Sequence, residues 1–205
     1  MIDFGSAVEF PAAPFADRWG TYGKFCLSQV KNSGMWLEFG VATGVTAAEI
    51  IKSIPAEEKL YGFDWFNGLP EKWEISPHNV KPKGELFGSV PGLIPRLPGL
   101  KVVNGLFADT LPGFFDDKGE QPVAFVHVDC DLYESTKTIF KYVGSRLVPG
   151  TIIMFDEIYG YPNYHLHEYR AWSEFVEESG LGFEWLAFCG ESTAGPGHQA
   201  ACRVI

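Results

Sequence analysis

The sequence lacks the cysteine patterns of a zinc site and of a disulfide framework. Its four cysteines, Cys26, Cys130, Cys189 and Cys202, are far apart, and no two of them stand in C-x-x-C spacing. A small secreted scaffold would carry a denser set of cysteines. We therefore expect reduced, mostly buried thiols and a cytoplasmic location.

Segments that direct a chain into or across a membrane are also missing. The first residues, MIDFGSAVEFPAAPFADRW, carry acids where a signal peptide needs bases, and they contain no unbroken apolar core. No uncharged apolar stretch approaches the roughly 20 residues that cross a bilayer. We expect a soluble protein without a membrane partner.

Positive charge is scarce. Lys and Arg total 16 against 26 Asp and Glu, so the formal net charge is −10, and the basic residues are scattered along the chain. A nucleic-acid partner needs a basic face for its phosphates. The composition argues against DNA and RNA and leaves a small molecule as the expected partner.

The pattern that is present is typical of an α/β fold. Short apolar runs alternate with helical patterns and no linker interrupts them, which favours a mostly parallel sheet with helices on both faces. A chain of 205 residues suits one core, so we expect a single domain over residues 1–205 that begins with a helical segment at 1–34. The seven expected strands are Met35–Phe39, Leu60–Asp64, Lys101–Asn104, Val123–Val128, Thr151–Phe155, Phe183–Phe188 and Gln199–Val204.

Helical patterns and loops fill the intervals between these strands. The last two strands are joined by GESTAGPGH, which leaves no room for a crossover helix, so they should pair as an antiparallel hairpin. Residues 68–100 form a long connection rich in proline and glycine, and such a connection is usually a functional lid over a pocket. The expected helices are Tyr22–Val30, Thr46–Ile54, Ser135–Leu147 and His165–Ser179.

An acid and two glycines end the first expected strand. In LEFGVATG, Glu38, Gly40 and Gly44 have the spacing E-x-G-x-x-x-G, and a helix opens near Thr46. Glycines let the backbone approach a ligand, and a helix N-terminus offers free N–H groups to an anionic group. The same residues would also make a tight turn that binds nothing.

Asp64 ends the second expected strand, where a carboxylate binds ribose in doubly wound folds. A loop-capping Asp is the alternative. Together with the glycine turn, this acid favours an adenosine-containing cofactor. A nicotinamide dinucleotide is disfavoured because the turn does not match G-x-G-x-x-G.

Acids also end the fourth and fifth expected strands. Asp129 and Asp131 follow in FVHVDCD, and Asp156 and Glu157 follow in IIMFDE. Because the carboxyl ends of adjacent parallel strands meet, these carboxylates should converge and repel one another unless they share protons or bind a cation. Oxygen ligands favour Mg²⁺, with Mn²⁺ or Ca²⁺ as alternatives. The competing interpretation is that these acids only cap helices.

Three histidines lie near these motifs. His165 and His167 are two residues apart, so they cannot share a helical face, and solvated positions at a helix start are the simpler interpretation for both. His167 is the better candidate for a substrate contact and thus for a catalytic role. His127 lies inside an expected strand and is interpreted as a hydrogen-bonded core histidine.

The chain resembles the class I S-adenosylmethionine-dependent methyltransferases and, within them, the macrocin O-methyltransferase-like family. The resemblance covers most of the chain and rests on LEFGVATG, YGFDWFNGLPEKW, GLFADTLP, FVHVDCDLYEST and PGTIIMFDE followed by HEYRAWSEF. It implies a three-layer Rossmann-like fold whose seven-stranded sheet has the order 3-2-1-4-5-7-6, with the seventh strand antiparallel.

The resemblance also implies roles for single residues. Asp129, Asp156 and Glu157 match the metal ligands of metal-dependent members, where the metal binds two neighbouring oxygens of the substrate. Two departures stand out: the third ligand is Glu157 where relatives usually have Asp or Asn, and no Lys follows Asp129, so Asp129 itself would take the hydroxyl proton. The implied contacts to S-adenosylmethionine are Glu38, Gly40, Gly44 and Thr46 at its amino-acid end, Asp64 at the ribose, and Phe107 and Ala108 at the adenine.

The expected function is therefore an O-methyltransferase that uses S-adenosylmethionine and a divalent cation such as Mg²⁺. Its acceptor would be a hydroxyl, one of a vicinal pair, on a sugar or another natural product. The alternative is a non-catalytic domain that binds a cofactor or metal and serves as a partner or sensor. The sequence leaves open whether the protein forms a homodimer.

Overall fold

The computed structural model describes residues 2–11, 13–189 and 198–205. Its main sheet has eight strands in the order β1-β9-β10-β8-β7-β2-β3-β6, and β4 pairs with β5 in a separate hairpin. The strands are β1 Val8–Phe10, β2 Met35–Phe39, β3 Leu60–Asp64, β4 Trp73–Ser76, β5 Asn79–Lys81, β6 Leu100–Asn104, β7 Val123–Val128, β8 Leu147–Tyr159, β9 Phe183–Cys189 and β10 His198–Val204.

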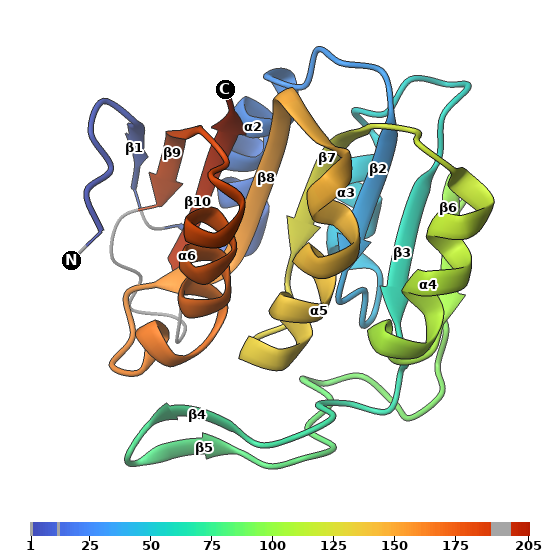
Figure 1. The fold of residues 1–205 in the computed structure, drawn as a ribbon. Helices are drawn as coiled ribbons and strands as arrows, with labels where there is room; N and C mark the ends of the chain where they lie inside the picture. The colour runs from blue at the N-terminus through green and yellow to red at the C-terminus, as the bar shows by residue number, and fades with distance from the viewer. Residues whose placement is uncertain (1, 12, 190–197) are drawn as a thin grey trace.

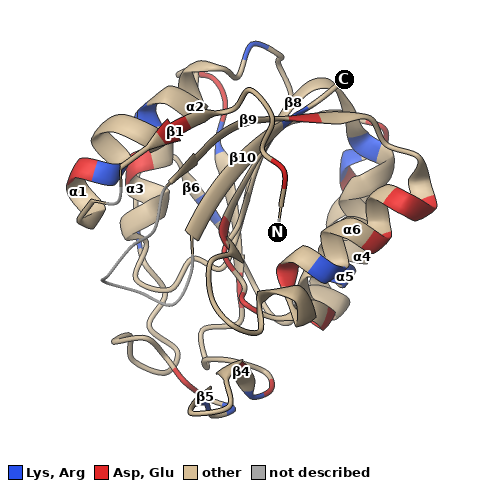
Figure 2. Ribbon diagram, turned by 90° about the vertical axis from the view of Figure 1, so that its left-hand side faces the viewer, with Lys and Arg blue, Asp and Glu red and all other residues tan. Residues whose placement is uncertain are grey.

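Helices cover both faces of the main sheet, so the molecule has three layers (Figure 1). Figure 2 shows α1, α2 and α3 on one side of the sheet and α4, α5 and α6 on the other. The helices are α1 Phe15–Arg18, the π-helix η1 Trp19–Gly23, α2 Lys24–Ser28, α3 Val45–Ile51, α4 Phe107–Lys118, α5 Tyr133–Val143, the 3-10 helices η2 Gly144–Arg146 and η3 Tyr164–Leu166, and α6 Glu168–Ser179.

The central strands are buried over their whole length. Every residue of β2 (MWLEF) and β7 (VAFVHV) is buried, as expected for parallel strands with helices on both faces. Alternate residues enter two cores: Leu37 and Phe155 pack toward α4, α5 and α6, while Trp36 and Met154 pack toward η1, α2 and α3. This alternation decides on which face each polar side chain of the same strands lies.

The sheet order confirms the topology that the resemblance implied. In chain order, the seven expected strands correspond to β2, β3, β6, β7, β8, β9 and β10, and their arrangement in the sheet is 3-2-1-4-5-7-6. β10 is antiparallel to both β8 and β9. Most of the GESTAGPGH connection, residues 190–197, lies outside the described residues.

The N-terminal segment differs from a purely helical one. Residues 8–10 form β1, an eighth strand that pairs in parallel with β9 at the sheet edge, and helices follow only from residue 15. The three residues of β1 are too few to show a period of two, and two of them are exposed. Pairing with β9 therefore creates a strand that the local pattern does not reveal.

Two further elements were not expected. α4 contains Pro112, which lacks a backbone N–H and usually ends a helix, followed by Gly113. The β4–β5 hairpin lies within residues 68–100 and is held by a small core of its own, formed with two residues from elsewhere in the chain. The members of this core are Leu69, Trp73, Ile75, Leu132 and Tyr161.

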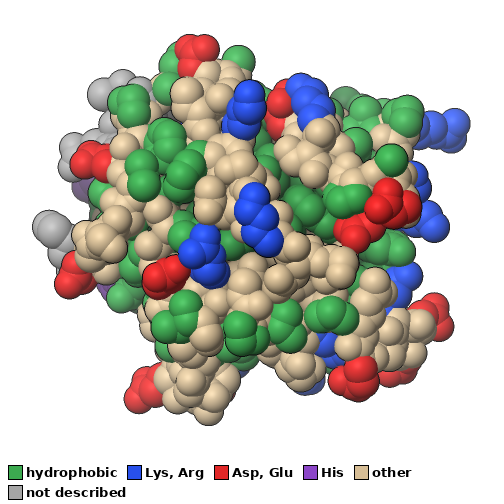
Figure 3. Space-filling view, turned by 90° about the horizontal axis from the view of Figure 1, so that it is seen from above, with side chains coloured by type: hydrophobic (Ala, Val, Ile, Leu, Met, Phe, Trp, Pro, Cys, Tyr) green, Lys and Arg blue, Asp and Glu red, His purple; other side chains and the backbone are tan. Residues whose placement is uncertain are grey.

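Charged side chains occur at both ends of the molecule (Figure 2, Figure 3). Acidic positions occur at the carboxyl ends of the strands, on the side where β4 and β5 lie (Figure 2). At the opposite end, seen from above in Figure 3, Lys and Arg side chains are dispersed among hydrophobic and acidic ones. Within the described residues, no helix has the length and apolar character needed to span a membrane.

Candidate functional site

A cavity of about 500 Å³ opens at the carboxyl ends of the strands. Its walls come from the turns after β2, β3, β6 and β7, from β8, and from parts of residues 64–89. The predicted site residues that line it are Gly40, Asp64, Phe107, Ala108, Asp129, Asp156 and Glu157.

The glycine turn after β2 is pressed against the end of β7. Gly40 has φ +93°, and a Cβ at this position would overlap the carbonyl oxygen of Asp129. The Asp129 N–H in turn donates to the carbonyl of Phe39 over 2.9 Å. A side chain at Gly40 would therefore separate the two strand ends that form this part of the cavity.

Asp64 holds the same turn in place. Its Oδ2 accepts hydrogen bonds from the N–H groups of Val41 (2.9 Å) and Ala42 (2.8 Å), and its Oδ1 accepts from Phe66 (2.7 Å). Ala42 has φ +44°, a conformation that costs free energy in any residue except glycine. The three hydrogen bonds to Asp64 help to offset this cost. The Asp64 carboxylate also lines the cavity. A contact between Asp64 and ribose stays a prediction.

Three of the predicted cofactor residues do not line the cavity. Glu38 is completely buried beneath it. Gly44 is packed against the loop at Pro95, since a Cβ there would lie 2.9 Å from that side chain. Thr46 is half-buried in the first turn of α3. Their roles in binding stay predictions.

Aromatic and aliphatic side chains form the rest of the wall. Phe107 begins α4, and its ring meets that of Phe39 edge-on at 5.4 Å, while Ala108 follows at the helix start. Most of the apolar wall comes from the segment that contains the hairpin, which largely coincides with the expected lid, although none of its side chains was named from the sequence. These residues are Trp65, Phe66, Leu69, Trp73, Leu86 and Phe87.

Acidic side chains converge at the other end of the cavity. Val128 pairs with Phe155, which places Asp129 beside Asp156, and the amide of Gln199 from β10 donates to Asp156. Burial raises the pKa of Asp129 well above its ordinary value, and the charges of Asp156 and Asp131 raise it further. The expected convergence of Asp129 and Asp156 is therefore observed.

Two more carboxylates join this group. Glu168, the first residue of α6, is completely buried, and its Oε1 accepts from the N–H groups of Cys130 and Asp131, each over 3.2 Å. Burial, followed by the charge of Asp131, raises the pKa of Glu168 to about 8. Burial and the charge of Asp156 raise the pKa of Asp131 to about 7. Glu168 is the acid of the HEYRAW motif, but the sequence did not predict it as a site residue. Only tertiary packing brings α6 to the end of β7.

A comparison with protein families identifies the chain. A family model described as a methyltransferase domain matches residues 37–158, more than half of the chain. The chain belongs to this methyltransferase family. The matched region runs from β2 into β8 and includes the glycine turn, Asp64 and the acids that end β7 and follow in β8.

Solved structures share the fold of this methyltransferase. The calicheamicin methyltransferase CalS11 is 22% identical with a TM-score of 0.67, over 92% of this chain and 78% of that one. The O-methyltransferase NovP is 16% identical with a TM-score of 0.58, over 88% and 76% of the two chains. An O-methyltransferase from Bacillus cereus, solved in complex with SAH, is 16% identical with a TM-score of 0.59, over 94% and 84%.

These likenesses confirm the class I methyltransferase fold that the sequence resemblance implied; the macrocin-like subgroup stays a prediction. None of the curated proteins compared with this methyltransferase matches it.

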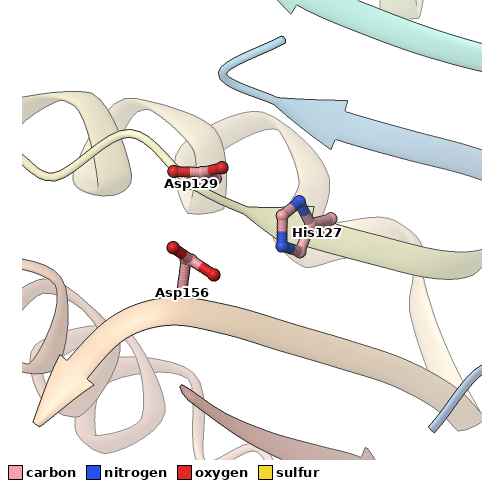
Figure 4. Close-up of side chains that lie close together, drawn as sticks. All are labelled: His127, Asp129 and Asp156. Carbon is pink, nitrogen blue, oxygen red and sulfur yellow. The ribbon is translucent and has the colours of Figure 1, made fainter. Parts of the chain in front are cut away.

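The predicted metal ligands do not form one compact group in this methyltransferase. β8 continues to Tyr159, beyond the expected end at Phe155, so Asp156 and Glu157 lie inside a strand, next to a register shift in the pairing of β8 with β10. Burial, followed by the charge of Asp156, raises the pKa of Glu157, whose Oε2 is buried without a hydrogen-bond partner. Among the described residues, the donors that lie within 4.8 Å of one another belong to His127, Asp129 and Asp156 (Figure 4).

His127 is buried in β7, as expected, yet it belongs to this acidic group. Its Nδ1 lies 3.5 Å from Oε1 of Glu38, its register partner on β2, and its ring meets that of Trp19 edge-on. The sequence did not suggest this role because His127 occurs in an otherwise apolar strand.

His167 attaches the hairpin to α6 instead of lining the cavity. Only 8% of it is exposed, one ring nitrogen lies 3.2 Å from the carbonyl oxygen of Glu74 in β4, and the rings of Trp73 and Tyr161 flank it. Burial lowers its pKa. His167 therefore does not line the cavity in this structure, and its catalytic role stays a prediction.

Proposed function

We propose that this methyltransferase transfers a methyl group from S-adenosylmethionine to a hydroxyl oxygen of a small molecule, with the help of a divalent cation. The observation that carries the proposal is one cavity with two chemically different ends. The glycine turn and Asp64 lie at one end, and buried carboxylates lie at the other.

The first end suits the cofactor. Gly40 gives close access to the backbone, Asp64 presents a carboxylate suited to the ribose hydroxyls, and Phe107 and Ala108 offer an apolar wall suited to adenine. When bound, S-adenosylmethionine supplies a methyl group on a positively charged sulfur. Its binding to the O-methyltransferase fold is supported by the SAH complex of the Bacillus cereus protein.

The second end suits a divalent cation. Asp129 and Asp156 lie side by side, and the buried Oε2 of Glu157 has no partner among the described residues. A cation would offset the repulsion between these carboxylates and lower the pKa of a hydroxyl bound to it. Asp129, which holds a proton readily because it is buried among other acids, would accept the hydroxyl proton.

The charge of the side chains that line the cavity limits which acceptor molecules can bind. None of the described lining residues is Lys or Arg, whereas Asp131, Glu85 and Glu134 add acids to those already named. Phosphate groups would be repelled there, while a neutral or cationic molecule with an apolar part would fit the aromatic wall. A hydroxyl with a second oxygen beside it would suit a cation at the acidic end.

Residues 68–100 are proposed to act as a lid. Leu69 before the hairpin and Trp73 at its start line the cavity, and the stretch after the hairpin contributes Leu86 and Phe87. Phe87 is 48% exposed, so an apolar acceptor would bury additional surface by contacting it.

All four cysteines are free and buried, which supports the proposed cytoplasmic location.

Transfer of labelled methyl from S-adenosylmethionine to a panel of vicinal diols tests this proposal. We expect transfer that chelator abolishes and added Mg²⁺ or Mn²⁺ restores, with little change in cofactor affinity. Asp129→Asn should lower turnover by ~10²-fold or more, the usual scale for a positioned general base. Cofactor binding without transfer to any diol would favour the non-catalytic alternative, and full activity in chelator would remove the cation from the mechanism.

A further inference from the structure

The position of His127 differs from that of an ordinary core histidine. A divalent ion bound at about 2.0–2.2 Å to each of two ligands holds those ligand atoms roughly 3–4.4 Å apart. One donor atom from each of His127, Asp129 and Asp156 lies within 4.8 Å of the others, so small movements would place all three around one ion. The three side chains face one another in Figure 4.

Glu38 provides a second, independent observation. It is completely buried, and neither of its carboxylate oxygens has a hydrogen-bond partner among the described residues. The atom that faces it is Nδ1 of His127, 3.5 Å from Oε1. Burial of an unpaired carboxylate is costly, and a hydrogen bond from Nδ1–H of His127 would offset part of that cost.

The pair of Glu38 and His127 matches the geometry of histidines that bind metals. Such a histidine donates its other ring N–H to a carboxylate, which fixes the tautomer and the ring orientation. Glu38 on β2 would take Nδ1–H, which leaves Nε2 as the donor atom for an ion. β8, which carries Asp156, lies on the other side of β7 from β2, and Figure 4 shows one ring nitrogen on that side.

The spacing of the donor atoms explains why His127 would serve in place of Glu157. His127 and Asp129 are two residues apart and share the face of the sheet on which Asp156 lies, toward η1 and α2. Glu157 has no donor atom in the group that lies within 4.8 Å, whereas His127, Asp129 and Asp156 each have one. A ligand set with one imidazole nitrogen and two carboxylates suits transition metals such as Mn²⁺ better than Mg²⁺, which prefers oxygen alone.

We infer that His127, oriented by Glu38, is a ligand of the divalent cation together with Asp129 and Asp156, and that the site selects Mn²⁺ or a later transition metal over Mg²⁺. This inference rests on the proposed function for the location of the cation. It adds the identity of a ligand and the class of metal.

Electron spin echo spectroscopy of Mn²⁺ bound to the full chain tests the ligand directly. We expect modulation from a coordinated nitrogen, a change of its frequencies when the protein carries ¹⁵N-histidine, and its loss in His127→Asn. Glu38→Gln should keep the modulation but weaken Mn²⁺ binding by ~10–100-fold, the usual effect of removing the carboxylate behind a metal-bound histidine. Glu157→Gln and His167→Asn are the matched controls, and both should keep the modulation.

Each alternative result has a definite meaning. Bound Mn²⁺ without nitrogen modulation in the unmodified protein would overturn the inference, and this measurement needs no variant to fold. Modulation that survives in folded His127→Asn would also overturn it. Because methyl transfer is measured separately, metal-dependent activity without nitrogen coupling would leave the proposed function intact, whereas transfer that needs no metal would remove both.

Discussion

At the scale of single residues, the site depends on side chains that serve structure and function together. Asp64 accepts three backbone hydrogen bonds that hold the glycine turn and also lines the cavity. Glu168 ties the end of β7 to α6 through two backbone N–H groups and adds a buried ionisable group. Replacing either carboxylate should therefore change the affinity for the cofactor or the free energy of unfolding.

Replacement of Asp64 should weaken binding of the cofactor. We expect Asp64→Ala to lose at least ~1.5 kcal/mol, about a tenfold rise in Kd, because a charge-assisted hydrogen bond to ribose is removed and the turn loses its acceptor. Titration calorimetry with S-adenosylmethionine measures the change. Asp109→Ala, which removes an exposed carboxylate from α4, is the control and should bind normally. Unchanged affinity in Asp64→Ala would remove this residue from the site.

Glu168 should make the stability of the cofactor-free protein depend on pH. Its pKa is raised to about 8, so the folded state holds the proton more tightly than the unfolded state does. The contribution is present below the unfolded pKa and is lost as pH rises, so the free energy of unfolding should fall between about pH 5 and about pH 8. Asp131, with its pKa raised to about 7, acts in the same direction.

Glu168→Gln tests this prediction because glutamine keeps an oxygen for the two N–H groups and removes the titratable group. Thermal melts in chelator should show a smaller decrease in Tm from low to high pH than in the unmodified protein, by about 3 °C or more. Glu177→Gln, at an exposed position of the same helix, should leave the pH dependence unchanged. Parallel pH curves for Glu168→Gln and the unmodified protein would contradict the assignment.

At the scale of secondary-structure elements, residues 68–100 divide into two parts. The β4–β5 hairpin has a packed core that includes Trp73 and Ile75, and His167 fastens it to the start of α6. The stretch that follows is exposed, with Phe87, Val90 and Leu93 each about half exposed or more. The hairpin is thus a fixed wall, and the following stretch is the part suited to closure.

Hydrogen exchange should separate these two parts. Without ligands we expect protection in residues 73–81 and weak protection in residues 86–94, because few buried contacts hold the latter. Cofactor and acceptor together should increase protection in residues 86–94. Strong protection of residues 86–94 in the free protein, or no change on binding, would contradict the proposed lid.

At the scale of the whole molecule, charge is distributed to suit one class of ligand. The chain carries a formal net charge of −10, and its cavity is lined by acids without Lys or Arg among the described lining residues. The field at the cavity should therefore favour cationic over anionic acceptors, and the preference should weaken with added salt.

A matched pair of catechols tests this preference. Dopamine and 3,4-dihydroxyphenylacetate share the ring and its hydroxyls and differ in the charge of the side chain. We expect kcat/KM for dopamine to exceed that for the acid by ~10-fold or more at low salt, mainly through KM. Glu134→Gln should narrow the difference, and Glu178→Gln on the exposed end of α6 should not. Equal kcat/KM values would show that cavity charge does not select the acceptor.

The sequence alone determined the class of fold and the general location of the site. Continuous apolar runs in β2 and β7 predict buried parallel strands, and Gly40, Asp64 and Asp129 stand directly at strand ends, where doubly wound sheets form their crevice. These features are local, because strand periodicity and turn chemistry depend on neighbours in the chain.

Only the tertiary structure decided which side chains share the acidic end of the cavity. The pairing of β10 with β8 extends β8 past Phe155 with a register shift, and Glu157 does not join the compact donor group that contains Asp129 and Asp156. Register between β2 and β7 places Glu38 against His127, and helix packing brings Glu168 to the end of β7. Strand pairing, register and helix packing are set between distant segments, so the grouping of His127 with Asp129 and Asp156 has no signal in the local sequence.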